Sequence, residues 1–235
     1  MATWAVRASP TPGPSLEWRG EAWHSLLERV GGCVVKLHWS PRSPFVRKVM
    51  VCAHELGVAG RIETVRTVVA MDKPNPLLLF DNPLGKIPTL VLDDGTVLYD
   101  SLVICEYLDS LAGPKLFSAA GAARWTALTW HALGTGLLDT LILWRNEREK
   151  PAPHAAWLAA FELKAETALD HIETLVPGME AAAFGIGQIT LGIVPAYIDF
   201  RFRELGWRAG RPRLARWYDK VAARASMKAT EAVDA

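Results

Sequence analysis

A serine-proline step at Ser43-Pro44 is the feature that most constrains this chain of 235 residues. It follows the apolar run Val34–Trp39, which predicts a strand, and opens a helical pattern that ends at Leu56, before Gly57. Ser43 suits the cap of that helix and Pro44 its first position, where a missing N–H costs nothing. The free backbone donors and the helix dipole there favour a negative charge, so a thiol held against Ser43 would ionise more readily than in water.

Two further motifs follow, Asn82-Pro83-Leu84-Gly85-Lys86-Ile87-Pro88-Thr89-Leu90 and then Asp100-Ser101. A cis peptide bond before Pro88 would leave the N–H and C=O of Ile87 outside the sheet, where an extended peptide ligand can pair with them. Asp100 can accept from an ammonium group, and Ser101 with the free N–H groups of a helix start can receive a carboxylate. Each motif by itself also has a purely structural interpretation. Pro88 could be a trans proline that starts an edge strand, and Asp100-Ser101 could simply cap a helix.

Taken together and in this order, the three motifs resemble the cytosolic glutathione transferase family, particularly its bacterial members. The resemblance runs from about Cys33 to nearly the C-terminus. It implies an α/β plus all-α fold, with an N-terminal thioredoxin-like domain followed by an all-helical C-terminal domain. It also implies a homodimer, a cis step at Ile87-Pro88, and glutathione as co-substrate without a metal.

The order of elements along the chain agrees with that fold. A strand, a helix and a strand precede a hairpin and a final helix, and the rest of the sequence is helical in pattern. The elements expected after the first helix are a strand at Ile62–Val68, a partly helical stretch at Pro74–Leu84, hairpin strands at Thr89–Leu92 and Thr96–Tyr99 around Asp93-Asp94-Gly95, and a helix at Ser101–Leu111.

We predict four parts in the chain. Residues 1–32 form an N-terminal extension, a proline-rich flexible arm with a short helix, and residues 33–112 form the thioredoxin-like glutathione-binding domain. A linker at 113–123 leads into the helical domain at 124–235. The helices expected in that domain are Arg124–Glu149, Ala155–Val176, Ile189–Leu205 and Pro212–Ala225.

The charge balance and the apolar stretches of the sequence bear on binding to nucleic acid and to membranes. The formal net charge is +1, with 26 lysines and arginines against 25 acids, so no general electrostatic attraction to nucleic acid or to an anionic membrane is expected. The apolar stretch Trp125–Trp144 is long enough to span a bilayer, but His131 and Asp139 favour a buried central helix instead. The start of the chain lacks the apolar stretch of a secretory signal, which favours a cytoplasmic protein.

Three cysteines, Cys33, Cys52 and Cys105, lack the spacing of a zinc site and are odd in number. We expect a reducing environment, with Cys52 and Cys105 buried as small apolar side chains. Cys33 opens a strand, and its role stays open.

The resemblance assigns roles to particular residues. Ser43 is the candidate catalytic residue, with Ser40 as the alternative because it also precedes a proline. Ser43 stands where Cys-type relatives carry a nucleophile, and a hydroxyl cannot exchange with a disulfide, so activation of a bound thiolate is favoured. Arg47 and Lys48 are expected to face solvent or surface acids. The expected glutathione contacts are Phe45, Lys86, Ile87, Pro88, Asp100 and Ser101, and the electrophile pocket is assigned to Trp39 and Trp130, between the domains.

The function implied is that of a glutathione transferase in detoxification, which activates the glutathione thiolate to attack a small hydrophobic electrophile. The same site would serve a glutathione-dependent isomerase or lyase. A non-catalytic glutathione-binding or ligand-binding protein of the same fold is the alternative from another class. A mixed-disulfide reductase ranks third because it needs a cysteine at Ser43.

Two departures from the family fall in the helical half. Relatives begin a core helix with Ser or Thr followed three residues later by Asp, whereas here Thr190 is followed by Ile193. The sequence thus predicts a weakly capped start for that helix, at a cost of about 1 kcal/mol. Ser226 lacks the preceding proline that is common in relatives, with Ala225 in its place.

Overall fold

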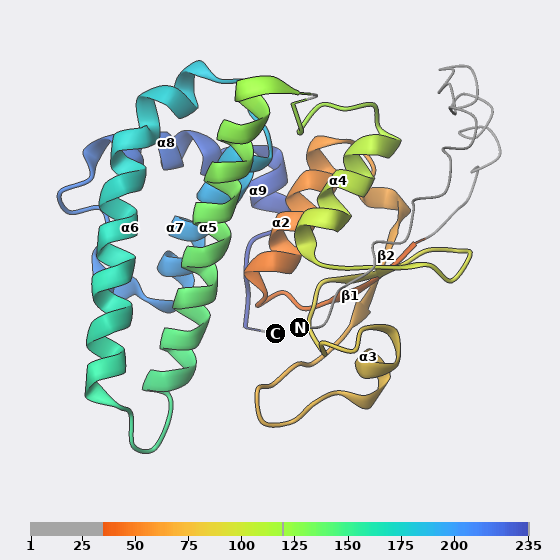
Figure 1. Cartoon of the computed structure of the whole chain (residues 1–235), viewed down its shortest axis with the longest axis horizontal. Helices are drawn as coiled ribbons and strands as arrows, with labels where there is room; N and C mark the ends of the chain where they lie inside the picture. Colours follow the sequence, from red (N-terminus) through yellow and green to blue (C-terminus); the bar gives the residue numbers. More distant parts are fainter. Residues whose placement is uncertain (1–34, 119, 235) are drawn as a thin grey trace, which may run out of the picture. The chain divides into compact units, whose positions relative to one another are not determined.

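A computed structural model describes residues 35–118 and 120–234 (Figure 1). The predicted arm and helix within residues 1–32, and Cys33, lie outside the described residues. A four-stranded sheet with the order β2-β1-β3-β4 forms the first half of the described chain. Its strands are β1 (Val35–Trp39), β2 (Ile62–Arg66), β3 (Thr89–Val91) and β4 (Val97–Leu98).

The register of the sheet follows the sequence pattern. β1 pairs in parallel with β2, from Val35 opposite Ile62, and antiparallel with β3, with Leu37 opposite Leu90. β3 and β4 form the predicted hairpin, whose turn contains Gly95 at φ +83°. Only glycine adopts such a φ without strain, which explains why the turn signal lies there.

Three α-helices complete this domain, α2 (Pro44–Glu55), α3 (Pro76–Asp81) and α4 (Ser101–Leu111), with a short 3₁₀ turn at Ala59–Arg61. Figure 1 shows α2 and α4 on one side of the sheet and α3 on the other. The order β1, α2, β2, α3, β3, β4, α4 is that of a thioredoxin-like domain, so the predicted fold class is confirmed for this half.

The second half of the chain is helical, as predicted. Figure 1 shows α5 and α6 running side by side, with α7 next to them. α7 is buried along nearly its whole length, from Ile186 to Ile198, so it forms the centre of the domain. The helices are α5 (Gly121–Arg148), α6 (Ala155–Ala181), α7 (Ile186–Arg201), α8 (Pro212–Ala222) and α9 (Ala225–Ala229), with a 3₁₀ turn at Arg203–Leu205.

The start of α7 differs from the prediction. The helix begins at Ile186 rather than Ile189, and the backbone N–H of Gly185 donates to the side-chain carbonyl of Gln188 over 3.2 Å. Gln188 therefore satisfies a donor at the helix start, which is one half of a reciprocal cap. Thr190, predicted to be at the start, is an interior residue with no exposed surface. The predicted position of this helix start was therefore wrong.

α6 also differs, because it continues five residues past Val176 and contains Pro177. A proline removes one backbone hydrogen bond and usually ends a helix. Here the last turn buries the side chain of Met179 in the core, and this burial offsets the lost bond.

α2 joins the two halves, since it contacts α4 in its own domain and α7 and α9 in the helical domain. The connection between the halves is fixed by Asp109, a buried residue in α4. Its carboxylate accepts from the backbone N–H groups of Lys115, Leu116 and Phe117, at 2.9, 2.8 and 3.2 Å. Among the described residues, no helix has both the length and the apolar character needed to cross a membrane.

Candidate functional site

Ser43 caps α2 as the sequence predicts. Its backbone is extended, at φ −82° and ψ 119°, and its Oγ accepts from the backbone N–H of Val46 over 3.3 Å. Pro44 occupies the first helical position. A hydroxyl that accepts one hydrogen bond retains its own proton, so Ser43 is still able to donate to an anion bound at the start of the helix.

Ser40, the alternative hydroxyl, lies in a different setting. Its Oγ accepts from the Arg66 guanidinium over 3.1 Å and from the backbone N–H of Arg42 over 3.4 Å. Ser40 also accepts at its carbonyl from the N–H of Ser43, which holds the loop in a tight turn. Ser40 thus supports the loop that positions Ser43, and it is not at a helix start.

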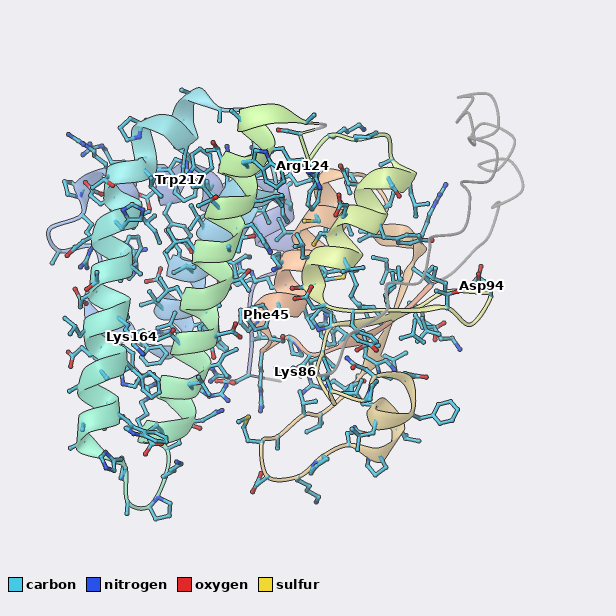
Figure 2. All side chains as sticks on the ribbon, in the orientation of Figure 1. Phe45, Lys86, Asp94, Arg124, Lys164 and Trp217 are labelled. Atoms are coloured by element: carbon cyan, nitrogen blue, oxygen red, sulfur yellow. The ribbon has the colours of Figure 1, made fainter. Side chains whose placement is uncertain are left out.

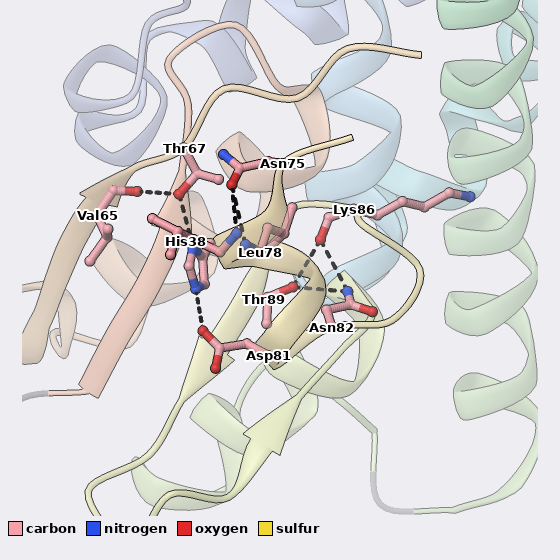
Figure 3. A network of polar contacts seen from close by, with 10 residues as sticks. His38, Val65, Thr67, Asn75, Leu78, Asp81, Asn82, Lys86 and Thr89 are labelled. Atoms are coloured by element: carbon pink, nitrogen blue, oxygen red, sulfur yellow. Dashed lines mark hydrogen bonds and ion pairs between the residues drawn. The ribbon is translucent and has the colours of Figure 1, made fainter. Parts of the chain in front are cut away.

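The loop from Asn82 to Thr89 is organised by the Asn82 side chain, which is buried (Figure 3). Its Nδ2 donates to the carbonyl of Lys86 over 3.1 Å and to the Thr89 hydroxyl over 2.9 Å, and its Oδ1 accepts from the N–H of Leu84. The Ile87-Pro88 peptide bond is cis, as predicted. The sheet pairing begins only at Thr89, so the backbone of Ile87 lies outside the ladder.

A second set of contacts ties the same loop to β1. The ring of His38 lies 2.8 Å from the Asp81 carboxylate through Nε2 and 2.8 Å from the Thr67 hydroxyl through Nδ1 (Figure 3). Thr67 donates onward to the carbonyl of Val65. Because Asp81 directly precedes Asn82, these bonds anchor the start of the loop to the central strand.

Asp100 and Ser101 lie at the entrance of α4, as predicted. The Asp100 carboxylate caps the helix by accepting from the N–H of Leu102 over 2.9 Å, and it is exposed to solvent. Ser101 is the first helical residue and is buried. The Tyr99-Asp100 peptide bond is also cis, which the sequence did not predict.

Charged side chains of the first domain act on Asp139 in the helical domain. Lys86 is exposed, and Figure 3 shows its ammonium extending toward α5. Partial burial raises the pKa of Asp139 on α5; the charges of Lys86 and Lys48 oppose that rise, and the charge of Asp100 adds to it. Asp139 was missed as a site residue by sequence reasoning, because nothing local distinguishes it on a long helix.

Lys48 corrects the prediction that it faces solvent. It has no exposed surface, and its Nζ lies 3.4 Å from the hydroxyl of Thr135 on α5 and 5.6 Å from the centroid of the Phe45 ring. Burial lowers the pKa of Lys48. Arg47 also points inward, since its guanidinium donates to the carbonyl of Met227 over 3.1 Å. The helical domain covers this face of α2, which the helix's own sequence does not reveal.

Behind Lys48, a buried histidine continues the polar contacts into the helical domain. His131 on α5 lies 3.4 Å from the Thr135 hydroxyl through Nε2 and 3.0 Å from the Thr190 hydroxyl through Nδ1. Burial, reinforced by the charge of Lys48, lowers the pKa of His131 to about 4. The ring is therefore neutral at physiological pH.

The three aromatic site candidates have different positions. Phe45 is half-buried at the start of α2, and Figure 2 shows it on the side of the domain that faces α5. Trp39 is half-buried at the end of β1, with the Arg66 guanidinium 5.8 Å from its ring centroid. Trp130 is buried in the helical core, and α7 packs so closely against it that a Cβ added to Gly187 would lie 3.0 Å from the Cβ of Trp130. Trp130 therefore does not line an open pocket.

A narrow crevice does lie beside Ser43, but other residues line it. They come from the loop after β1, from α2, from α7 and from the segment that follows α9. They are Arg42, Ser43, Pro44, Arg47, Ile193, Tyr197 and Ala232. The sequence predicted a site between this loop and the second domain, but not that α7 and the C-terminal segment supply its wall.

Cys52 and Cys105 are both fully buried, as predicted. Burial raises the pKa of the Cys52 thiol well above its usual range, so this thiol is not a thiolate at neutral pH.

Comparison with known proteins gives matches both to a family and to solved structures. Residues 42–111 match the family described as glutathione S-transferase, N-terminal domain. A glutathione transferase family member from Pseudomonas fluorescens Pf-5, crystallised with bound glutathione, is 40% identical; the match covers 85% of this chain and 99% of that one, with a TM-score of 0.82.

A crystal structure from the same organism with bound S-(propanoic acid)-glutathione matches with a TM-score of 0.78 and 38% identity, over 85% of this chain and 100% of that one. The uncharacterized GST-like protein YibF of Escherichia coli K12 is 28% identical over 84% of this chain and 98% of its own length. The identity of 38 to 40% with the two solved structures extends along nearly their whole length, and the fold is shared. These matches establish that the chain belongs to the glutathione transferase family.

Proposed function

We propose that this protein is a glutathione transferase in which Ser43 stabilises the thiolate of bound glutathione for attack on a small electrophile. The observation that carries the proposal is the position of Ser43 at the N-terminus of α2, with its hydroxyl proton free to donate. Crystal structures of relatives with bound glutathione support this choice of thiol.

The contacts we propose for glutathione follow from the loops described above. The backbone of Ile87, outside the sheet ladder, would pair with the cysteinyl residue, as in the addition of a short strand. Ser101 and the free N–H groups of α4 would receive the γ-glutamyl carboxylate. Asp100 would accept from the ammonium group, and Lys86 would contact a carboxylate.

The energetics are consistent with this role for Ser43. A free thiol has a pKa of about 8.5, and lowering it by about two units corresponds to roughly 2.7 kcal/mol. One hydrogen bond to a charged group contributes about 1.5 to 3 kcal/mol, and a helix N-terminus about 0.3 to 1 kcal/mol. Together these two contributions are large enough to make most of the bound thiol nucleophilic at neutral pH.

In the proposed reaction the thiol proton leaves to solvent and Ser43 donates its hydrogen bond to the sulfur. The thiolate attacks an electrophilic carbon, a C–S bond forms, and the bond to the leaving group breaks, with the electron pair departing on that group. The enzyme contributes proximity and control of the thiol pKa. A reducing cytoplasm, where detoxification by glutathione takes place, is the proposed setting.

We also propose that the protein is a homodimer, as the resemblance to the family implies. Several apolar side chains on and near α3 are exposed, including Phe80 and Leu77, 91% and 80% accessible. Burying such a surface between two copies would stabilise a dimer. Light scattering should give a mass of two chains, and Phe80→Ser should shift the protein toward the monomer.

The decisive test measures the ultraviolet absorbance of the glutathione thiolate on the protein, together with conjugation of a generic electrophile. Ser43→Ala should abolish the thiolate absorbance at pH 7 and lower kcat/KM by about 10- to 100-fold, in proportion to the loss of about 1.5 to 3 kcal/mol. Ser43→Thr keeps both the hydroxyl and the cap and should retain most of the signal. Ser40→Ala is the matched control.

The outcomes separate the alternatives. Unchanged thiolate absorbance in Ser43→Ala, with loss in Ser40→Ala, would transfer the role to Ser40. Tight glutathione binding without thiolate absorbance or turnover in the wild type would favour a non-catalytic glutathione-binding protein. Turnover that returns glutathione unchanged would indicate an isomerase.

A further inference from the structure

Three guanidinium groups from distant parts of the chain converge on the carboxylate of Asp234. Arg201, at the end of α7, donates through Nη1 and Nη2 to the two carboxylate oxygens of Asp234 over 3.0 and 2.7 Å. Arg42, in the loop that precedes Ser43, lies 3.3 Å from the same carboxylate through Nε. Arg145, near the end of α5, is close enough for its charge to act on Asp234.

A phenol completes this cluster. Tyr197 lies on α7, one turn before Arg201, and is 2% exposed. Tyr197 lines the crevice beside Ser43, and its hydroxyl makes no hydrogen bond of acceptable geometry within residues 35–118 and 120–234. The charges of Arg145 and Arg201 act on the hydroxyl, and the Arg145 guanidinium approaches it without good hydrogen-bond alignment. A buried hydroxyl without a partner costs about 1 to 3 kcal/mol, so its retention needs an explanation outside the packing of the core.

The surroundings are more basic than the chain as a whole. The chain carries a net charge of +1, yet Arg42 and Arg47 both line the crevice, and the charges of Arg145 and Arg201 act on Tyr197 in its wall. The acids nearby are Asp234, Glu231 and Glu149, of which Glu149 lies 3.7 Å from Arg145 and Glu231 acts on Arg47. Planar guanidinium forks bind carboxylates in a bidentate manner, as Arg201 does here with Asp234.

The anion seated on these arginines comes from the C-terminal segment. After α9 the chain runs back beside α2 toward the loop after β1 (Figure 1), and Ala232 forms part of the crevice wall. Asp234 itself remains 56% exposed, so its carboxylate is held at the surface rather than built into the core. A small ligand with a carboxylate can replace such a contact without unfolding any helix.

We propose that Arg42, Arg145, Arg201 and Tyr197, which we call the arginine pocket, bind the carboxylate of an anionic electrophile, and that Asp234 takes its place in the unliganded protein. The proposal rests on the proposed function and adds the substrate class: electrophiles with a carboxylate a few atoms from the reacting carbon. The reacting carbon would then face the sulfur at Ser43, because Arg42 and Ser43 are adjacent and line the same crevice.

Isothermal titration calorimetry with two matched adducts tests the pocket. The probes are S-(2-carboxyethyl)glutathione and its neutral amide, S-(2-carbamoylethyl)glutathione, which differ only in the charge at the end of the added group. The wild type should bind the carboxylate at least five-fold more tightly than the amide. Arg201→Gln and Arg42→Gln should each bring this ratio to within two-fold of one, while the affinity for the amide changes little.

Asp234→Asn provides the opposite change, because it removes the competing charge and keeps the pocket. It should tighten binding of the carboxylate probe about three- to ten-fold and leave the amide unaffected. Arg203→Gln is the matched control, since Arg203 is exposed and donates to the Asp199 carbonyl on the protein surface. It should preserve the wild-type ratio.

Free glutathione in the same titrations separates this inference from the proposed function. If glutathione binds, but the two adducts bind equally in wild type and in Asp234→Asn, the arginine pocket is overturned and the transferase proposal stands. If neither glutathione nor an adduct binds, both fail together. A ratio above five that survives Arg201→Gln and Arg42→Gln would place the carboxylate elsewhere and also overturn the pocket.

Discussion

The Lys48 ammonium lies 3.4 Å from the Thr135 hydroxyl, so a buried cation on α2 is bonded to a side chain on α5. At the other end of these contacts the Thr190 hydroxyl donates to the Ile186 carbonyl, so its single proton is not available to His131. Nδ1–H of His131 must therefore donate to Thr190. Because burial lowers the pKa of His131 to about 4, the ring is neutral at pH 7, and its Nε2 accepts from the Thr135 hydroxyl.

Replacing Lys48 by Met should preserve or increase stability at neutral pH. Its buried ammonium makes a single long hydrogen bond, and an apolar side chain of similar length avoids the cost of burying the charge. Because burial lowers the pKa of Lys48, the stability of the wild type should rise as the pH climbs toward the unfolded value of about 10.4. Thermal unfolding at pH 8 and pH 10 should show this rise in wild type and not in Lys48→Met. Lys36→Met, at an exposed position, should keep it.

Acid should destabilise the protein through His131 before most carboxylates titrate. The unfolded state binds a proton near pH 6.5, whereas burial delays protonation in the folded state to about pH 4. Stability should consequently fall as the pH drops from 6.5 to 4, by up to about 3 kcal/mol. His131→Gln should flatten that part of the curve in urea unfolding. An equal slope in both proteins would contradict the assignment of a neutral histidine.

Replacing Asn82 by Ala should weaken glutathione binding more than it weakens the fold. It removes two donors to the Lys86 carbonyl and the Thr89 hydroxyl, so the backbone of Ile87 loses its support. We expect a rise of about ten-fold in the Kd for glutathione and a loss of stability of about 1 to 3 kcal/mol. Asn75→Ala removes the cap of α3 and should cost about 1 kcal/mol without changing the Kd.

Glu55 should matter more than other surface carboxylates. It accepts from Nε and Nη2 of Arg224 over 2.8 and 2.6 Å and from the Ser226 hydroxyl, and these bonds join the end of α2 to the start of α9. The bonds lower the pKa of Glu55, so its contribution is present above the unfolded pKa of about 4.3 and is lost as the pH falls through the lower folded value.

Glu55→Gln should therefore cost about 1 to 2 kcal/mol at pH 7, measured by chemical denaturation. Glu106→Gln breaks a more exposed pair with Arg124 and should cost less than about 0.5 kcal/mol. Similar losses of stability in the two variants would show that the contacts of Glu55 with α9 stabilise the fold no more than an exposed ion pair does.

Two glycines in helices should respond to alanine with opposite signs. A Cβ on Gly187 would lie 2.8 Å from the carbonyl oxygen of Ala127 and 3.0 Å from the Cβ of Trp130, so α5 and α7 would be pushed apart. Gly187→Ala should cost about 1 to 3 kcal/mol. A Cβ on Gly136 meets nothing within 4 Å, and Gly136→Ala should add up to about 1 kcal/mol through helix propensity. Thermal unfolding of both variants measures the difference.

Local chemistry explains which parts of the fold were predictable. The bounds of α2 and α4 follow from Ser43 and Asp100, because caps act within one turn and need no information from the rest of the chain. The cis bond at Ile87-Pro88 was expected from the resemblance to the family that the surrounding motif carries, and not from local chemistry. The capping pattern also gave one wrong prediction: Thr190 looks like a cap in the sequence, whereas α7 starts at Ile186 and Gln188 bonds back to the N–H of Gly185.

Contacts between distant segments explain what was not predictable. A lysine in a helix ordinarily faces water, and only the covering helices make Lys48 a buried residue. Trp130 was assigned to the ligand pocket, but the close approach of Gly187 places it in the core. The arginines around Asp234 come from a loop and two helices, and Asp234 itself comes from the C-terminal segment; their separation of up to about 190 residues leaves no local pattern.

α2 belongs to two domains at once, since α7 and α9 cover the face that α4 leaves open. A recombinant fragment ending after Leu111 would expose a stripe of valines around an uncovered ammonium, and we expect it to aggregate rather than bind glutathione. Chimeras that exchange helical halves between relatives would meet the same obstacle. To remain soluble, such a hybrid must inherit α2, α7 and α9 from a single parent.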